Sequence, residues 1–376
     1  MSTARPITVG LTGSGYPEKR NIIDLPHEGV RFVRHRDPVQ LLDLLYFKAT
    51  GKLAHQLHAV HHDLGLRRAD VLHFFNKLSL SRTPWVSTFE TRIPRVYQPG
   101  PKLFDALARP ACKQLIAMSQ RALRIQQAML EQRPTIKDDV LSKTIVLHPA
   151  QRALIDRTDD KGPLGELIHF TFVGHEFFRK GGLATLRTFD RAIANGSPVQ
   201  LTIVSELLTG DHVSQSGAAE VNEALAIIGR HPKRIMHHGS LSNAEVMELL
   251  RKSDVVLLPT LHDSYGYSVL EGQAMGCPVI STDVAALPEI NDDDRGWIIR
   301  APKDEMGEGL WRTPEARSRF SLAIEEQLAS HLEEIVRSPN LIRKKGARAL
   351  DRIRSDHDPA DRARVLDAIY ARASGR

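Results

Sequence analysis

The segment Asp263-Ser-Tyr-Gly-Tyr-Ser-Val-Leu-Glu271 contains two carboxylates around an aromatic-glycine turn. It follows the apolar run Val255–Leu258 and precedes a second apolar run at Pro278–Ile280. This order predicts a strand, a loop, a helix and another strand. Both carboxylates of the stretch then lie near the carboxyl edge of a parallel sheet, which is where open α/β sheets bind their ligands.

The same alternation of apolar runs and helical segments extends over the whole chain, so we expect an α/β protein built from doubly wound parallel sheets. In the first half, a long helix is expected from Val39 to about Leu64 and another over Gln120–Leu130. From Glu315 onward the pattern is helical. The expected strands are Ile7–Leu11, Val30–Val33, Val71–Phe75, Trp85–Phe89, Leu115–Ala117, Thr144–Leu147, Ile168–Val173, Val199–Val204, Arg234–His237, Val255–Leu258, Pro278–Ser281 and Trp297–Ile299.

A chain of 376 residues exceeds what one hydrophobic core usually supports, so two domains are expected. We place a Rossmann-like domain at 1–155 and a second one at 166–355. The segment from Pro149 to Gly165 is charged, contains Gly162-Pro163 and is the natural linker. Residues 356–376 are expected to form a final helix.

Composition limits the class of protein. Hydrophobic residues make up 41% and charged residues 26%, as in a globular protein. No apolar run approaches the ~20 residues of a membrane span, and two distant cysteines suggest a reducing compartment. We therefore expect a cytoplasmic protein, with a peripheral place at the inner membrane face as an alternative. No nucleic-acid-binding module is visible, so no nucleic-acid partner is expected.

Charge is unevenly spread along the chain. Residues 1–150 carry 22 Lys and Arg against 12 Asp and Glu, a balance of +10, and the remainder carries 29 against 33, a balance of −4. A basic first half favours an anionic or membrane-presented partner on that side. The alternative is an ordinary solvated surface.

The spaced acids Asp263 and Glu271 resemble the paired-glutamate motif of family-four retaining glycosyltransferases, with aspartate in the first position. The resemblance implies two Rossmann-like domains facing each other across a cleft, the GT-B fold, in which the final helix at 356–376 crosses back to the first domain. It also implies that Glu271 binds the donor ribose and that Asp263 faces the donor sugar. The turn between the acids (Tyr265, Gly266, Tyr267, Ser268) would lie at the donor diphosphate. The structural alternative is a capping box formed by Ser268 and Glu271.

A second motif, Phe172-Val-Gly-His-Glu-Phe-Phe-Arg-Lys-Gly-Gly182, predicts a strand that runs into a polar loop and a helix. It resembles the family's basic diphosphate-binding loop, with Lys180 as the matching cation. Gly181 and Gly182 would let backbone amides approach a phosphate. The family's usual arginine is replaced by His175, and Arg179 is a candidate substitute. A simple helix start is the alternative.

Weaker similarities complete the candidate site. His238 and Gly239 follow a strand at the place where the family reads the nucleotide base. Gly13 and Gly15 follow the first strand, where the family has a loop that touches diphosphate and acceptor; a plain turn is the alternative. Glu90 follows another strand on the acceptor side, with an ordinary loop acid as the alternative.

These motifs together imply a nucleotide-sugar-dependent retaining glycosyltransferase that moves a sugar to a hydroxyl acceptor, with Asp263, Glu271 and Lys180 as its catalytic residues. We expect no cofactor and no metal, and we interpret His55, His58 and His62 as surface or partly packed histidines rather than metal ligands. The alternatives are a catalytically weakened sugar-nucleotide binder and a sugar-nucleotide epimerase on the same fold. The base, the sugar, the acceptor and the oligomeric state do not follow from the sequence.

Overall fold

The computed structural model describes residues 5–35, 37–52, 57, 59–65, 68–96 and 99–376. The chain divides into two compact units. Unit 1 comprises Met1–Ala150 and His357–Arg376, and unit 2 comprises Gln151–Asp356. The linker predicted from Pro149 to Gly165 contains one short 3-10 helix, Thr158–Lys161, and belongs almost entirely to unit 2.

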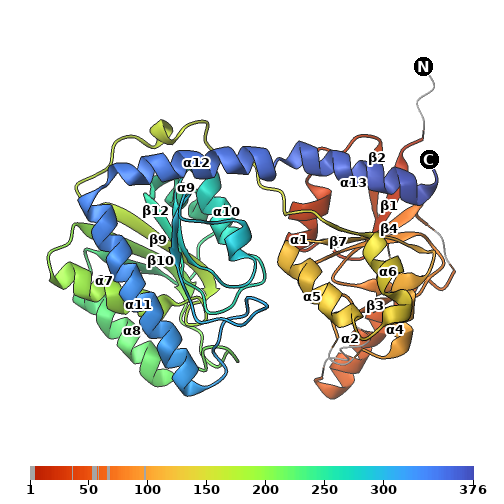
Figure 1. Ribbon diagram of the computed structural model, residues 1–376, viewed down its shortest axis with the longest axis horizontal. Helices are drawn as coiled ribbons and strands as arrows, with labels where there is room; N and C mark the ends of the chain where they lie inside the picture. The colour runs from red at the N-terminus through yellow and green to blue at the C-terminus, as the bar shows by residue number, and fades with distance from the viewer. Residues whose placement is uncertain (1–4, 36, 53–56, 58, 66–67, 97–98) are drawn as a thin grey trace. The chain divides into compact units, whose positions relative to one another are not determined.

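Unit 1 is built on a six-stranded sheet in the order β2-β1-β4-β6-β7-β8, and every neighbouring pair is parallel (Figure 1). Its strands are β1 (Ile7–Leu11), β2 (Val30–Arg34), β4 (Val71–Phe75), β6 (Trp85–Phe89), β7 (Cys112–Ala117) and β8 (Thr144–Val146). The short strands β3 (Val60–His61) and β5 (Leu78–Ser79) form a separate pair. The helices are α1 (Tyr16–Glu18) with a π-helical turn at Lys19–Ile23, α2 (Pro38–Thr50), α4 (Pro101–Ala108), α5 (Gln120–Leu130), α6 (Pro134–Ser142) and α13 (Pro359–Ser374).

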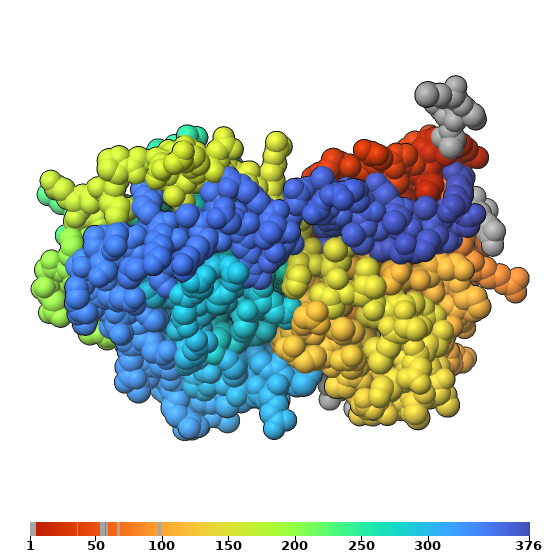
Figure 2. Space-filling view, turned by 45° about the horizontal axis from the view of Figure 1, so that its top comes forward, coloured from red at the N-terminus to blue at the C-terminus, as the bar shows by residue number. Residues whose placement is uncertain are grey.

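Successive residues of the central strands enter two different cores because side chains alternate across a sheet. On one face Leu72, Trp85 and Leu115 pack with residues of α4, α5 and α6. On the other face Val71, Val86 and Ile116 pack with Leu366, Ile369 and Tyr370 of α13. The C-terminal helix therefore closes the second face of the unit 1 sheet, and Figure 2 shows it in dark blue beside the red N-terminal segment.

The long helix predicted from Val39 to about Leu64 is wrong in its second half. Helix α2 ends at Thr50, and Gly51 follows with a φ of 67°, a left-handed conformation that glycine adopts at helix ends. Val60 and His61 then form β3 instead of another helical turn. The other predicted helix of this half, over Gln120–Leu130, is confirmed as α5.

Unit 2 repeats the architecture with a six-stranded sheet in the order β11-β10-β9-β12-β13-β14, again entirely parallel. Figure 1 shows α7, α8 and α11 on one side of this sheet and α9, α10 and α12 on the other. The strands are β9 (Ile168–Glu176), β10 (Val199–Glu206), β11 (Ile235–His238), β12 (Val255–Leu258), β13 (Val279–Thr282) and β14 (Trp297–Ile299). The helices are α7 (Gly182–Ala194), α8 (Ala218–Arg230), α9 (Asn243–Lys252), α10 (Tyr267–Ala274), α11 (Pro314–Arg337) and α12 (Asn340–Asp356).

The predicted fold class, doubly wound α/β, is confirmed in both units. In each sheet the chain first builds outward in one direction and then returns to continue in the other. The reversal lies between β1 and β4 in unit 1 and between β9 and β12 in unit 2. Ligands of open α/β sheets bind beside such reversals, outside the carboxyl ends of the strands.

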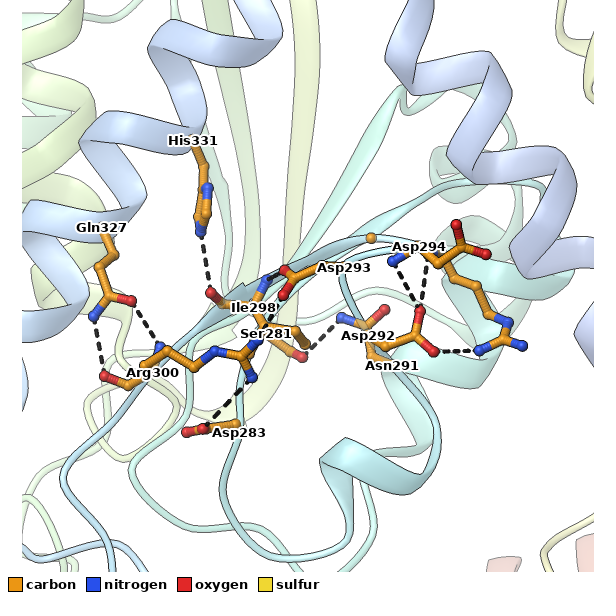
Figure 3. Close-up of polar contacts among 12 residues, drawn as sticks. Ser281, Asp283, Asn291, Asp292, Asp293, Asp294, Ile298, Arg300, Gln327 and His331 are labelled. Carbon is orange, nitrogen blue, oxygen red and sulfur yellow. Dashed lines mark hydrogen bonds and ion pairs between the residues drawn. The ribbon is translucent and has the colours of Figure 1, made fainter.

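A polar network holds the outer strand β14 in place (Figure 3). The amide of Ile298 donates to Asp293 at 3.0 Å, and the carbonyl of Ile298 lies 3.2 Å from the His331 ring of α11. Gln327, also on α11, bonds both the amide and the carbonyl of Arg300. The edge strand is therefore tied to α11 through groups that would otherwise be left without partners at the sheet margin.

No helix within the described residues is both long enough and apolar enough to cross a membrane.

Candidate functional site

The two sequence motifs meet at the reversal point of the unit 2 sheet. Residues 177–181 join β9 to α7, and residues 259–266 join β12 to α10. Since β9 and β12 are neighbouring parallel strands, their loops emerge side by side at the carboxyl edge. The predicted association of the basic loop with the acidic motif thus follows directly from the topology.

Lys180 and Asp263 form the centre of this site. Their side chains make an ion pair although they lie 83 residues apart in sequence. Their side-chain exposures are only 12% and 15%. Burial alone would raise the pKa of the Asp263 carboxyl, but the charge and hydrogen bond of Lys180, aided by Arg179, hold that pKa below its ordinary value. Asp263 is therefore a carboxylate at neutral pH.

Arg179, the candidate substitute for the family's arginine, pairs with the carboxylate of Glu176 at the end of β9. Its backbone carbonyl also accepts from the amide of Leu261, 3.0 Å away, which joins the two loops. His175 is exposed and is the next-to-last residue of β9. At the position of the family's usual arginine this chain therefore has the exposed ring of His175. The guanidinium of Arg179 is already paired with the carboxylate of Glu176.

Gly181 and Gly182 have a packing role that the sequence did not reveal. Gly181 has a φ of +80°, and a Cβ there would come within 2.0 Å of the Pro259 carbonyl oxygen. A Cβ on Gly182 would come within 2.2 Å of the Phe177 ring. The two amides donate to carbonyls of Phe178 and Phe177 at 3.1 and 2.9 Å, so the expected approach of these amides to a phosphate is corrected. The glycines instead allow the basic loop to lie against β12.

Glu271 lies in the second turn of α10, and its side chain is half-buried. The N-cap of this helix is Gly266, with a φ of 96°, so Ser268 is already inside the helix. A capping box between Ser268 and Glu271 is therefore excluded. The carboxylate of Glu271 does not serve as the helix cap, which removes the capping alternative for this residue.

The aromatic turn between the acids divides into a buried and an accessible part. Tyr265 is only 1% exposed because its ring packs in the core of unit 2. The ring is therefore not available to a donor, and the place of this residue in the donor-binding turn stays a prediction for its backbone. Tyr267, whose ring centroid lies 5.8 Å from that of Tyr265, and Ser268 are half-buried in the first turn of α10. The first N–H groups of a helix lack acceptors within the helix, and its N-terminus carries partial positive charge.

His238 and Gly239 are exposed at the carboxyl end of β11. They lie at the same sheet edge as Lys180 and Asp263 because all strands of the sheet are parallel. The preceding residue, His237, bonds the carbonyl of Ser205 at 2.8 Å and fixes β11 to β10. The topology thus puts Lys180, Asp263, His238 and Gly239 at one edge of the sheet, and Glu271 lies on the helix that begins there.

A polar cluster beside Asp263 was missed by the sequence analysis. His262 Nδ1 lies 2.5 Å from a carboxylate oxygen of Glu308, and the same oxygen accepts from Trp311 Nε1 at 3.3 Å. Glu308 and Trp311 belong to a segment after β14 in which Lys303 and Gly309 form an antiparallel bridge. The only signal available in the sequence was the position of His262 next to the first acid of the motif.

Unit 1 contains the three acceptor-side residues. Gly13 lines a cavity of about 400 Å³, and a Cβ there would come within 2.3 Å of a Glu18 carboxylate oxygen. Glu90 follows β6 and bonds Asn76 and Arg95, both of which line that cavity. Gly15 is the exposed N-cap of the three-residue helix α1 and does not line the cavity. The cavity lies beside the reversal point of the unit 1 sheet, between the ends of β1 and β4.

Within the described residues no group of three or more His, Cys, Asp or Glu side chains is arranged to hold a metal ion. Three consecutive acids precede β14, and each forms an ion pair. Asp292 pairs with Arg295, Asp293 with Arg300 and Asp294 with Arg348 (Figure 3 shows the three acids). His62 accepts from the amide of Leu64 at 3.0 Å. His55 and His58 lie outside the described residues.

Comparison with known proteins places the site in a family. Residues 168–310 match the family model described as Glycosyl transferases group 1. These residues form a group 1 glycosyltransferase domain. The family resemblance indicated by the spaced acids Asp263 and Glu271 is thereby confirmed. Lys180 and His262 also lie within the matched residues.

Curated relatives match short parts of the chain. An uncharacterized 41.2 kDa protein in the cps region of Klebsiella pneumoniae is 34% identical over 61 residues, 16% of this chain and 17% of that protein. A glycogen synthase of Mycobacterium tuberculosis is 23% identical over 135 residues, 36% of this chain and 28% of that protein. The matched part therefore spans less than a third of the length of either relative.

Among solved structures, Anabaena HepE in complex with UDP has a TM-score of 0.60 at 13% identity, covering 97% of this chain and 100% of that chain. At this identity the likeness establishes the fold alone. The fold class of the glycosyltransferase domain and of the unit that accompanies it is GT-B.

Proposed function

We propose that the protein is a retaining glycosyltransferase that moves a sugar from a nucleotide-sugar donor to a hydroxyl acceptor. The observation that carries the proposal is the buried ion pair between Lys180 and Asp263 at the reversal point of the glycosyltransferase domain, with Glu271 on the adjoining helix. Neither motif by itself specifies a reaction. Their meeting at a ligand-binding edge of the sheet brings a cation beside one carboxylate, and the second carboxylate belongs to the helix that follows the same loop.

The donor diphosphate is assigned to Lys180. An ammonium group has three hydrogen-bond donors, so Lys180 can keep its bond to Asp263 and still bind a phosphate oxygen. The N-terminus of α10 adds partial positive charge from the turn Gly266-Tyr267-Ser268. Negative charge grows on the diphosphate as the glycosidic bond breaks, and these groups stabilise it.

The two carboxylates have separate roles. Glu271 accepts hydrogen bonds from the ribose hydroxyls, which is a charge-assisted contact. Asp263 orients the donor sugar and is held ionised by Lys180. His238 and Gly239 lie at the base, with His175 and Arg179 near the diphosphate. HepE was solved with UDP, so a uridine nucleotide is the first candidate to test.

Retention follows in this proposal from attack on the same face that the diphosphate leaves. The acceptor oxygen forms the new bond to the anomeric carbon while the bond to the diphosphate oxygen breaks, and the acceptor proton passes to the departing diphosphate. Asp263 is paired with Lys180 and is not assigned as a nucleophile. Because Lys180 supplies the positive charge, the proposed reaction does not call on a metal ion or another cofactor.

The acceptor is assigned to unit 1, at the cavity lined by Gly13, Asn76, Lys77 and Arg95 and bordered by Glu90. A polysaccharide or cell-envelope acceptor agrees with the cps-region relative and the glycogen synthase. No nucleic-acid partner enters the proposal.

The proposal is tested in two steps. A thermal-shift panel of UDP, GDP, ADP and their sugars identifies the donor, because a ligand raises apparent stability by mass action. Incubation with the selected donor then gives sugar release or transfer for an enzyme and unchanged donor for a catalytically weakened binder. The anomeric configuration of the product, determined by NMR, decides between retention and inversion. An epimerized nucleotide-sugar as the product would favour the epimerase alternative.

A further inference from the structure

Helix α2 presents a concentration of exposed apolar side chains. Six of the 14 exposed large hydrophobic residues in the described part of the chain fall within seven consecutive positions of this helix. A helix that is apolar on most sides is normally buried, and large exposed apolar patches mark interaction surfaces. The six are Leu41 (59% exposed), Leu42 (57%), Leu44 (47%), Leu45 (53%), Tyr46 (43%) and Phe47 (45%).

The exposed charged side chains on and beside α2 in the sequence are all positive. Across the described part of residues 34–52, the exposed charged side chains are Arg34, Lys48 and Lys52. The acids Asp37 and Asp43 are buried, and Asp37 caps the helix by accepting from the amide of Val39 at 3.1 Å. An anionic partner complements this surface. A second copy of the chain would instead bring the same cations together.

The length and exposure of α2 define the kind of anionic partner. Thirteen residues of helix measure about 20 Å, which is shorter than the ~30 Å hydrocarbon core of a bilayer. Apolar side chains on several sides suit a fluid medium that surrounds the helix better than a flat protein surface. Such a helix lies in the interface of a membrane, with its cations beside anionic headgroups.

The apolar helix is continuous with the candidate acceptor cavity. A second cavity, of about 940 Å³, runs along α2 and is lined by Leu41, Leu44 and Phe47. It shares Thr12 and Gln40 with the polar cavity of about 400 Å³ at the ends of β1 and β4. A molecule with a polar head and an apolar chain fits this succession of surfaces, with the head toward Asn76 and Arg95.

We propose that α2 docks unit 1 on an anionic lipid bilayer and that the acceptor is a lipid-linked hydroxyl compound taken from that bilayer. The docking stands on the surface of α2 alone. The assignment of the lipid as acceptor rests on the proposed function.

Vesicle flotation with the full chain tests the docking. We expect the protein to float with vesicles of phosphatidylcholine mixed with phosphatidylglycerol and to float poorly with phosphatidylcholine alone. The pair Leu42→Glu and Leu45→Glu changes two exposed residues that do not line either cavity, and it should reduce the bound fraction at least about tenfold because two apolar groups are lost from the membrane. Lys48→Glu with Lys52→Glu should abolish the preference for anionic vesicles.

The matched control is Leu225→Glu with Leu322→Glu on unit 2, where the two leucines are 50% and 53% exposed. This pair adds the same two charges and should float like the unaltered protein. Circular dichroism and the thermal shift with the donor nucleotide, measured on every variant, verify folding and report on the proposed function separately.

Absence of flotation by the unaltered protein would overturn the docking, and so would equal losses in the α2 pair and the control pair. A dimer in light scattering that the α2 pair dissociates, without vesicle binding, would make α2 a self-association surface and also overturn it. Flotation together with no nucleotide-induced thermal shift would leave the docking intact while the proposed function fails. If docking holds and the donor is used, equal transfer to water-soluble and lipid-linked acceptors would refute the lipid acceptor.

Discussion

The ammonium group of Lys180 and the carboxylate of Asp263 form an ion pair between the loops that follow two neighbouring parallel strands. One residue comes from the basic motif and the other from the acidic motif, so the pair joins the two halves of the proposed donor site. It also keeps Asp263 ionised against the effect of burial. The consequences of breaking the pair differ depending on which partner is removed.

Replacement Asp263→Asn should lower turnover by about 10²-fold, because an oriented charge at the donor sugar is lost while the shape is kept. Affinity for the nucleoside diphosphate should stay the same or increase, since Lys180 no longer shares its bonds with a carboxylate. Calorimetry with the nucleoside diphosphate and steady-state kinetics with the donor measure the two quantities. A parallel loss of affinity and turnover would show that Asp263 is needed for the nucleotide and not for the sugar.

Replacement Lys180→Met should change how stability depends on pH. In the unaltered protein the pKa of Asp263 is lowered from 3.8, so the ionised carboxylate stabilises the fold above that value and this contribution is lost as the pH falls further. Without Lys180 the effect of burial dominates, so the pKa of the Asp263 carboxyl should rise above its ordinary value of 3.8. The ionised carboxylate would then destabilise the fold instead of stabilising it. The variant should therefore be clearly less stable near neutral pH, and the difference in melting temperature should shrink on acidification toward about pH 4.5.

The control for that experiment is Lys252→Met, which breaks an exposed ion pair with Glu248. Exposed pairs contribute little to stability, so this variant should melt like the unaltered protein at both pH values. A constant stability difference for Lys180→Met across the same pH range would contradict the role given to Asp263.

Replacement Glu271→Ala should reduce nucleoside-diphosphate affinity by roughly tenfold to a hundredfold, because a charged hydrogen-bonding group costs about 1.5–3 kcal/mol when lost. No contribution from a helix cap should be lost, since Glu271 does not cap α10. For the control variant Glu245→Ala we expect the reverse, a change in stability without a change in affinity. Glu245 completes a capping box with Ser242 in α9, so its loss should lower the melting temperature and leave nucleotide affinity unchanged.

Replacement Glu308→Ala should loosen the loop that carries Asp263. Glu308 accepts from Trp311 Nε1 and lies 2.5 Å from His262 Nδ1, and loss of such bonds typically costs about 1–3 kcal/mol. We expect a lower melting temperature together with reduced turnover. Glu305→Ala, an exposed residue of the same segment, should affect neither. Unaltered kinetics in Glu308→Ala would mean that the cluster stabilises the fold without positioning the site.

The sequence predicted the strands well because strands of a doubly wound sheet are buried on both faces and appear as short continuous apolar runs. It failed where distant contacts decide. Helix α2 ends at Thr50, with Gly51 in a left-handed conformation, and Val60 then pairs with Leu78, a distant partner that nothing in the local pattern marks. Tyr265 lies in a polar motif yet is buried. Glu308 meets His262 across 46 residues, a contact that only the folded hairpin after β14 creates.

The uneven distribution of charge along the chain predicts how acceptor binding should depend on salt. Residues 1–150 have a balance of 22 − 12 = +10, and the remaining residues have a balance of 29 − 33 = −4. The acceptor is assigned to the basic half, and attraction between exposed charges weakens as the Debye length falls to about 8 Å at physiological ionic strength and further above it. Raising the salt concentration should therefore increase the apparent Michaelis constant for the natural acceptor several-fold and leave that for the donor nearly constant. Potassium chloride titrations of both constants measure this, and an equal response of donor and acceptor would reduce the basic half to an ordinary solvated surface.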